Sequence, residues 1–223
     1  ADLASEEALT KGLLSLYPDS VVTGEENLAQ SPERLGDLLK ADCGFLIDPI
    51  DGTNNFIKGN ERFAVMIVAL AKGKVIASWV YLPAKDIMTY AVKGEGAFIN
   101  DEKITLRTPK TELHDLIGAA HINRMPQEVR EHAKEKLRLI KENRPGFCAG
   151  YDYVSLVCGK KDFSVYYRTL IWDHLPGSLI YQEAGGYALG LDGQPYTPKN
   201  EGKGLLCASN EEMWHKINNE IFA

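Results

Sequence analysis

The stretch Asp48-Pro49-Ile50-Asp51-Gly52-Thr53 is the most informative part of this 223-residue sequence. It follows an apolar run at residues 45–47 that predicts a buried strand. Pro49 lacks the N–H group that a sheet ladder requires, so we expect the strand to end there. Gly52 allows a tight turn and Thr53 can begin a helix. Two carboxylates beside free backbone N–H groups suit magnesium and phosphate, respectively.

This stretch also has two other interpretations. An EF-hand loop starting at Asp48 needs an oxygen-bearing side chain two residues later and a glutamate eleven residues later. Those positions hold Ile50 and Gly59, so the calcium-loop interpretation fails. When the hexapeptide is considered alone, the interpretation as a Pro-Asp-Gly turn without any function also stays open.

The overall composition is typical of a soluble globular protein, with 44% hydrophobic and 25% charged residues. The net charge of -6 excludes a broad basic surface, so we expect no nucleic-acid partner. The longest apolar stretch, residues 63–70, is too short to cross a bilayer, so we expect no membrane partner. The four cysteines form no C-x-x-C pair and suit a reducing compartment. No signal peptide is visible, and the cytoplasm is therefore the expected location.

Hydrophobic periodicity and turn residues predict an alternation of helices and strands. We expect helices at residues 5–17, 32–40, 127–142, 152–158, 175–184 and before 222, and strands at 20–23, 45–47, 63–71, 75–82, 87–92, 97–99 and 163–167. Ser31 is the expected N-cap of the second helix. Pro176 should lie in the first turn of its helix, and Ser209 with Glu212 should form a capping box. Residues 107–113 are the expected seam between a metal-binding half, 1–107, and an α/β half, 108–223.

Five segments, in order, resemble the inositol monophosphatase family. The hexapeptide continued by Asn55-Phe56 is similar to the first signature of that family. The other four are Ala1-Asp2, Gly24-Glu25-Glu26, residues 93–100 (KGEGAFIN) and residues 172–177 (WDHLPG) continued by residues 183–186 (EAGG). The resemblance covers nearly the whole chain. It implies a mixed α/β chain with the layered αβαβα sugar-phosphatase fold, whose N-terminal part we expect to be missing, and a homodimer.

The resemblance also implies a two-metal site that binds two or more Mg²⁺ ions. Glu25, Asp48 and the Ile50 carbonyl would hold one ion, and Asp48, Asp51 and Asp173 a second. Four carboxylates this close would repel one another and raise their own pKa values without a cation. Two ions can activate a water and stabilise the leaving oxygen.

Further residues receive roles from the same resemblance. Thr53 and Asp2 resemble the pair that activates water: Thr53 bonds the water and Asp2 accepts a proton, with Glu25 sharing the catalytic role. Asp51, Gly52, Thr53, Ala149, Tyr166 and Asp173 are the expected substrate-binding residues.

Alternative roles stay open for several of these side chains. Asp173 could be only a helix N-cap, and Glu25 with Glu26 only a solvated acidic turn. His174 is expected to be structural, because magnesium prefers oxygen ligands. The four other histidines are expected on the surface.

Substrate choice is less constrained than the reaction. Inositol-preferring members of the family carry a glutamate seven residues before the aspartate of the second signature, and here that position is Tyr166. Tyr151, Asp152 and Arg168 are further candidates for substrate contacts, and Arg168 would suit a second anionic group. It could equally be a subunit-interface residue.

We therefore expect magnesium-dependent, lithium-sensitive hydrolysis of inositol monophosphate or a related sugar or polyol phosphate. The alternatives are a 3'-phosphoadenosine nucleotide, fructose bisphosphate, histidinol phosphate or NADP as substrate, and a non-catalytic binding relative.

Overall fold

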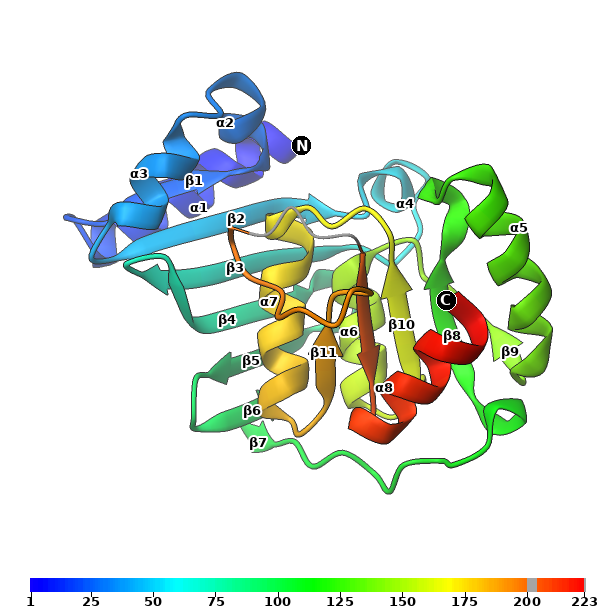
Figure 1. Cartoon of the computed structure of the whole chain (residues 1–223). Coiled ribbons are helices and arrows are strands. Elements are labelled where there is room, and N and C mark those ends of the chain that lie inside the picture. Colours follow the sequence, from blue (N-terminus) through cyan, green and yellow to red (C-terminus); the bar gives the residue numbers. More distant parts are fainter. Residues whose placement is uncertain (200–203, 223) are drawn as a thin grey trace.

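Five alternating layers of helices and sheets make up the chain (Figure 1). The computed structural model describes residues 1–199 and 204–222. Helix α1 packs on the outer face of a seven-stranded sheet, and the short helices α2 and α3 pack on its other face, beside the start of α7. Helices α6 and α7 lie between that sheet and a five-stranded sheet, and α5 and α8 cover the far side. This is the mixed α/β, αβαβα arrangement that the sequence predicted. No helix in the described part of the chain has the length and apolar character needed to cross a membrane.

The first sheet is a meander in chain order, β1-β2-β3-β4-β5-β6-β7, and only the β1–β2 pair is parallel. Its strands are β1 (Val21–Gly24), β2 (Gly44–Asp51), β3 (Ala64–Ala71), β4 (Lys74–Leu82), β5 (Ile87–Val92), β6 (Gly96–Ile99) and β7 (Glu102–Lys103). Both hairpins predicted from the sequence, β3–β4 and β5–β6, are confirmed. Tight hairpins depend on local sequence, which explains why they could be predicted.

Strand β2 differs from the prediction, because it continues through Pro49 as far as Asp51. Its pairing with β1 ends at Ile47, and its register with β3 shifts between Asp48 and Asp51. Pro49 therefore lies in an irregularity where no ladder partner needs its missing N–H. The same irregularity places both aspartates beside the sheet edge, before α4 (Thr53–Ile57).

The N-terminal helices are α1 (Asp2–Leu16), α2 (Glu25–Gln30) and α3 (Arg34–Lys40). The acidic turn expected at Glu25 is the start of α2, a helix the sequence analysis did not predict. The expected N-cap at Ser31 is wrong, since Glu33 occupies that position of α3. Glu6, in α1, is buried and accepts hydrogen bonds from the backbone N–H groups of Glu26 (2.9 Å) and Asn27 (3.0 Å). A side chain distant in sequence thus caps α2 and fixes the position of Glu25.

Helices α6 (Ala149–Val157) and α7 (Ile171–Glu183) form the central layer. They approach closely at Gly177, where a Cβ atom would lie 2.0 Å from the Tyr153 ring. Helix α7 begins four residues earlier than predicted, so Pro176 lies inside it and not in its first turn. The N-cap is Leu170, which means that the N-cap interpretation of Asp173 is wrong.

The second sheet has the order β11-β12-β10-β8-β9. Its strands are β8 (Ile117–His121), β9 (Glu142–Asn143), β10 (Phe163–Tyr166), β11 (Tyr187–Leu189) and β12 (Leu205–Ala208). Of these strands, only β10 was predicted from the sequence. Strands β8 and β10 are parallel neighbours, and Tyr166 pairs with His121 at their C-terminal ends.

Helices α5 (Gln127–Lys136) and α8 (Glu211–Ile217) pack on this sheet. The predicted long helix is shorter, because the chain continues as a 3-10 turn, η4 (Leu137–Leu139), into β9. The predicted capping box is wrong, since the N-cap of α8 is Asn210, whose side chain accepts from the Met213 N–H at 2.8 Å. The remaining short segments are η1 (Pro83–Lys85), η2 (Leu113–Asp115), η3 (Ile122–Arg124) and η5 (Asn218–Phe222).

Each sheet draws its strands from one side of the expected seam. All seven strands of the first sheet precede residue 107, and all five of the second follow it. Helices α6 and α7, from the second half, nevertheless pack on β3 and β4. The division into two units stays a prediction.

Candidate active site

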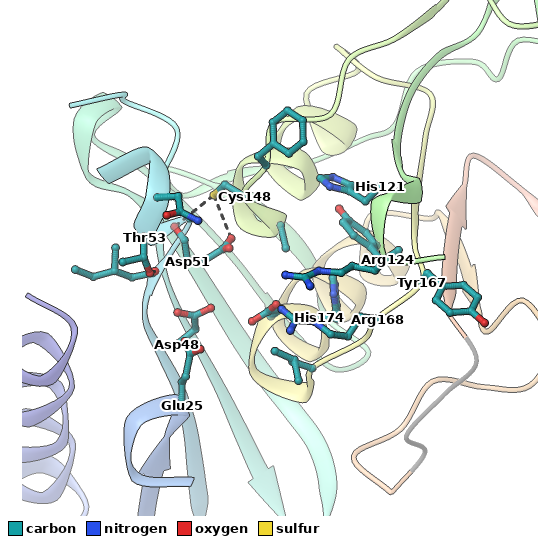
Figure 2. A pocket seen from close by; sticks show the side chains of 18 residues that line it. Glu25, Asp48, Asp51, Thr53, His121, Arg124, Cys148, Tyr167, Arg168 and His174 are labelled. Carbon is teal, nitrogen blue, oxygen red and sulfur yellow. Dashed lines mark hydrogen bonds between the residues drawn. The ribbon is translucent and has the colours of Figure 1, made fainter. Parts of the chain in front are cut away.

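A cavity of about 360 Å³ lies where the ends of the two sheets meet. Its lining combines carboxylates from β2, α2 and α7 with cationic and aromatic side chains that follow β8 and β10. Figure 2 shows the two sides of this cavity. On one side lie Glu25, Asp48, Asp51 and Thr53, and on the other His121, Arg124, Tyr167, Arg168 and His174.

Asp48 is the most deeply buried of the carboxylates, with 1% of its surface exposed. Its Oδ1 atom is covered and has no hydrogen-bond partner among the described residues. Burial raises the pKa of Asp48 well above its usual range, and the negative charges of Asp51, Asp173 and Glu25 raise it further. A buried carboxylate without donors is costly unless a cation or a proton neutralises it.

Asp51 is held in a fixed orientation by the start of α6. The Gly150 N–H donates to its Oδ2 at 2.6 Å, and the Cys148 thiol lies 3.1 Å from the same atom. Burial raises the pKa of Asp51, while the donors from Gly150 and Cys148 lower it. One carboxylate oxygen is thus tied to the protein, which leaves the other for a ligand.

Gly52 makes this approach of α6 possible. Its φ of +81° lies in the left-handed region, and a Cβ atom would lie 2.9 Å from the Cys148 Cβ. Glycine adopts this backbone conformation without the steric cost that other residues incur. The turn therefore brings Asp51 and the N-terminus of α4 to the same side of the cavity.

Glu25 and Asp173 complete the acidic side from two other elements. Burial raises the pKa of Glu25, and the charges of Glu26, Asp2 and Asp51 add to the increase. Burial and the charge of Asp51 raise the pKa of Asp173 to about 8. Arg168 acts in the opposite direction on both groups. These shifts show that four carboxylates from three elements lie within one another's fields.

Thr53 and Asp2 are in contact, although 51 residues separate them in the sequence. The Thr53 Oγ1 lies 3.1 Å from Asp2 Oδ1 and 3.0 Å from the Ile50 carbonyl oxygen. A hydroxyl has one proton, so it donates to one of these acceptors at a time. Its lone pairs stay available to accept a hydrogen bond from a water.

Among the described residues, no group of three or more His, Cys, Asp or Glu side chains is close enough, as the side chains stand, to hold a metal ion. The donors present are nevertheless those that magnesium prefers, namely carboxylate and carbonyl oxygens. The covered, unpartnered Oδ1 of Asp48 is a donor atom that the protein itself does not satisfy. The residues therefore fit a hard divalent cation in chemistry and in charge.

The aromatic and cationic side of the cavity is built around Tyr166. Its ring stacks on His121 at 4.9 Å and lies 4.3 Å from the His174 ring. The Tyr166 hydroxyl is covered and has no hydrogen-bond partner within the described chain. His174 is buried, which lowers its pKa to about 3, and its Nδ1 lies 3.3 Å from the Tyr153 hydroxyl. A neutral, enclosed imidazole agrees with the structural role expected for His174.

His121 is held from behind by a buried ion pair. Its Nε2 lies 2.6 Å from Asp152 Oδ2, and Asp152 also contacts the ammonium of Lys161 and the Gly146 N–H. Asp152 is fully buried and Lys161 is 7% exposed. The expectation that Asp152 contacts substrate is therefore wrong, because its carboxylate is used inside the protein. Tyr151 does not line the cavity.

The cavity lining brings together the predicted residues Glu25, Asp48, Ile50, Asp51, Gly52, Thr53, Ala149, Tyr166 and Asp173. Asp2 joins them through Thr53.

Four further residues that line the cavity were not predicted from the sequence, namely His121, Arg124, Phe147 and Tyr167. His121 was expected on the surface, like the three histidines at 114, 132 and 215, which are indeed exposed. The small, apolar run before His121 was the available signal, since it marks a strand whose end lies beside Tyr166.

Comparison with known proteins agrees with this geometry. The model of the inositol monophosphatase family matches residues 1–222. A "Nus factor SuhB" from Xylella fastidiosa is 27% identical over 229 residues, which cover 99% of this chain and 79% of that protein. A "Fructose-1,6-bisphosphatase/inositol-1-monophosphatase" from Aquifex aeolicus is 31% identical over 204 residues, which cover 87% and 72%.

A solved structure, inositol monophosphate-bound SaIMPase-II, shares the fold. Its TM-score is 0.85 at 28% identity, and the match covers 99% of this chain and 83% of that chain. The family match extends over both sheets and all the residues of the cavity. The chain therefore belongs to the inositol monophosphatase family and is a phosphoric monoester hydrolase.

Proposed function

We propose that this chain hydrolyses a small phosphate monoester, such as inositol monophosphate or a related sugar or polyol phosphate, with Mg²⁺ as cofactor. The observation that carries the proposal is the buried, unpartnered Asp48 Oδ1 among three other carboxylates. Such a cluster is stable in an ionised form only when a cation joins it.

The expected ligands are distributed over three elements. Glu25, Asp48 and the Ile50 carbonyl would hold one ion, and Asp48, Asp51 and Asp173 a second. When bound, the two ions supply Lewis-acid stabilisation of the attacking and leaving oxygens.

The chain's own groups position the reactants. Thr53 accepts a hydrogen bond from the attacking water, and Asp2, 3.1 Å from its hydroxyl, orients Thr53 and takes up a proton. Glu25 helps to orient the same water. The backbone N–H groups of Gly52 and Thr53, at the start of α4, face the transferred phosphate.

Substrate contacts beyond the phosphate come from the other wall. Ala149 lines the cavity at the start of α6, and Tyr166 presents its ring. The absence of a carboxylate at position 166 leaves the alternative esters open as substrates. We also expect inhibition by lithium and a homodimer in solution.

Phosphate release from inositol 1-phosphate, fructose 1,6-bisphosphate, NADP, histidinol phosphate and 3'-phosphoadenosine nucleotides, with and without Mg²⁺, tests the proposal. We expect metal-dependent release from at least one ester and none from Asp48→Asn. Metal-independent release, or no release from any ester, would contradict it.

A further inference from the structure

The cavity wall opposite the carboxylates carries a concentration of positive charge that the proposed chemistry does not use. We propose that Arg124 and Arg168, together with His121, bind a second anionic group of the substrate, a phosphate or carboxylate that is not hydrolysed. This inference rests on the proposed function and narrows its substrate class. It would make the preferred substrate a bisphosphate or a phosphorylated acid.

The parallel pairing of β8 and β10 brings these side chains together. Tyr166 pairs with His121 at the ends of the two strands, so the segments that leave the strands lie at the same sheet edge. Arg168 lies two residues beyond β10, and Arg124 lies in η3, directly after β8. Both arginines line the cavity, on the side opposite Asp48 and Asp51 (Figure 2).

Neither guanidinium group is held in a direct ion pair within the described part of the chain. Arg124 and Arg168 are exposed, and neither forms a salt bridge with any residue in the described ranges. Two arginines elsewhere in the chain are paired, since Arg107 binds Asp162 at 2.9 Å and Arg144 binds Glu142 at 3.3 Å. A guanidinium stays charged at all physiological pH values and matches a phosphate or carboxylate in two parallel hydrogen bonds.

The polarity of the wall also favours an anion over a row of hydroxyl groups. A polyol needs acceptors as well as donors, and a glutamate would have supplied acceptors at position 166. Here the Tyr166 hydroxyl is covered. The carboxylate behind His121, that of Asp152, is fully buried and bonded to His121 and Lys161. The wall is therefore rich in donors.

His121 is positioned to contribute a third contact. Asp152 holds its Nε2, and Tyr166 stacks against its ring, so the imidazole is fixed in orientation. Its Nδ1 has no hydrogen-bond partner among the residues that the structure describes. Since Nε2 donates to the Asp152 carboxylate, Nδ1 is a donor to an anion when the ring carries both protons, and a pre-oriented donor loses little conformational entropy when it binds.

Arg168 also acts on the carboxylate cluster, and an experiment must separate this effect from binding of the second anionic group. It lowers the pKa of Glu25 and Asp173, so part of its charge acts on the carboxylate cluster and on any phosphate bound there. Arg124, which follows the other strand, is therefore the sharper probe of the second anionic group.

The test compares pairs of esters that share the hydrolysed phosphate and differ in the second anion. The pairs are fructose 1,6-bisphosphate with fructose 1-phosphate, 3'-phosphoadenosine 5'-phosphate with adenosine 3'-phosphate, and 3-phosphoglycerate with glycerol 3-phosphate. The third pair distinguishes a carboxylate from a phosphate. The variants are Arg124→Gln and Arg168→Gln. Arg138→Gln is the matched control, because Arg138 is exposed, lies outside the cavity and carries the same charge.

We expect the unmodified protein to have a lower KM for the doubly charged member of at least one pair. Arg124→Gln should raise that KM about 10- to 100-fold, as expected for a lost charge-assisted hydrogen bond, with kcat nearly unchanged. The KM for the singly charged partner should change by less than about threefold, and Arg138→Gln should alter neither value.

Two results would overturn the inference. One is the absence of any preference for the second anion, and the other is an equal effect of Arg124→Gln on both members of every pair. If no ester releases phosphate, the proposed function fails, and equilibrium binding of the same pairs by calorimetry without magnesium then decides the anion site. Equal affinities for both members, or affinities that Arg124→Gln does not change, would reject it.

Discussion

The rings of His121 and Tyr166 stack at 4.9 Å, at the ends of two parallel strands that are 45 positions apart in the sequence. The contact joins the buried Asp152–Lys161 pair behind His121 to the cavity in front of Tyr166. It forms the aromatic part of this cavity wall, which Arg124 and Arg168 also line. Four predictions follow from this wall and from the acidic wall opposite.

Replacement of Tyr166 by phenylalanine should leave substrate binding nearly unchanged. The hydroxyl is covered and unpartnered, so its loss removes an unsatisfied polar group and should stabilise the fold by up to about 1 kcal/mol. KM for the best ester should stay within about twofold, because the ring supplies the contact. Urea unfolding and steady-state kinetics measure the two effects.

Tyr153→Phe is the control for this substitution, since that hydroxyl contacts His174 Nδ1 and its loss should destabilise the fold by about 1 kcal/mol. A large increase in KM for Tyr166→Phe would show that the hydroxyl turns toward the substrate. Tyr166→Glu should not simply create inositol preference, because the new carboxylate would lie in the fields of Asp51 and Asp152.

Asp152→Asn should destabilise the protein strongly. The change leaves the Lys161 ammonium, which is 7% exposed, without its counter-ion, and an unpaired buried charge costs about 3–5 kcal/mol. The double variant Asp152→Asn with Lys161→Met should recover much of that loss. Asp42→Asn, in the exposed pair with Lys72, is the control and should change the free energy of unfolding by less than about 1 kcal/mol. A loss below about 1 kcal/mol for Asp152→Asn would contradict the role of the pair.

Without metal, the protein should lose stability as the pH rises, partly through Asp173. Its pKa is raised from 3.8 in the unfolded chain to about 8 in the folded protein, so the folded state binds this proton more tightly. The stabilisation is fully present below about pH 4 and is lost progressively up to about pH 8. Asp173→Asn should flatten this dependence. Part of the Asp173 side chain stays in contact with water, which weakens the effect. Between low and high pH, the free energy of unfolding should therefore fall by about 1 kcal/mol or somewhat more through Asp173.

Urea unfolding in EDTA at about pH 5 and about pH 9 measures this dependence. Asp48 and Asp51, whose pKa values are also raised, act in the same direction, so some slope should remain in the variant. Asp42→Asn should retain the full slope. An Asp173→Asn variant as sensitive to pH as the unmodified protein would reject the assignment.

Removal of the Thr53 hydroxyl should lower kcat with little effect on metal binding. Thr53→Ala removes the hydroxyl that lies between Asp2 and the attacking water, and kcat should therefore decrease about 10²–10⁴-fold. Thr53→Ser keeps the hydroxyl and should retain most of the activity, and Asp2→Asn should resemble Thr53→Ala. Phosphate release and magnesium titration followed by calorimetry separate turnover from binding. Equal activities of the alanine and serine variants would remove Thr53 from the mechanism.

Local sequence was enough to predict the elements whose signals are local. The β3–β4 and β5–β6 hairpins depend on turns of a few residues, and the acidic hexapeptide is contiguous in the chain. The end of β2 was predicted wrongly, since a proline is tolerated wherever the neighbouring strand shifts its register, and register belongs to a pair of strands. The cap of α2 by Glu6 was also beyond local reasoning, because it joins two helices.

The sequence by itself determined the family, the reaction class and the carboxylates at 25, 48, 51 and 173, because these residues lie in recognisable motifs. Only the tertiary structure decided that Asp48 Oδ1 is covered and unpartnered, that Cys148 and Gly150 orient Asp51, and that His121 and Arg124 lie in the same cavity. Burial and electrostatic fields depend on every element packed around a group, and parallel pairing joins residues far apart in the chain. The motif from Asp48 to Thr53 is thus contiguous in the chain, whereas the packing of the two sheets assembles the cavity around it.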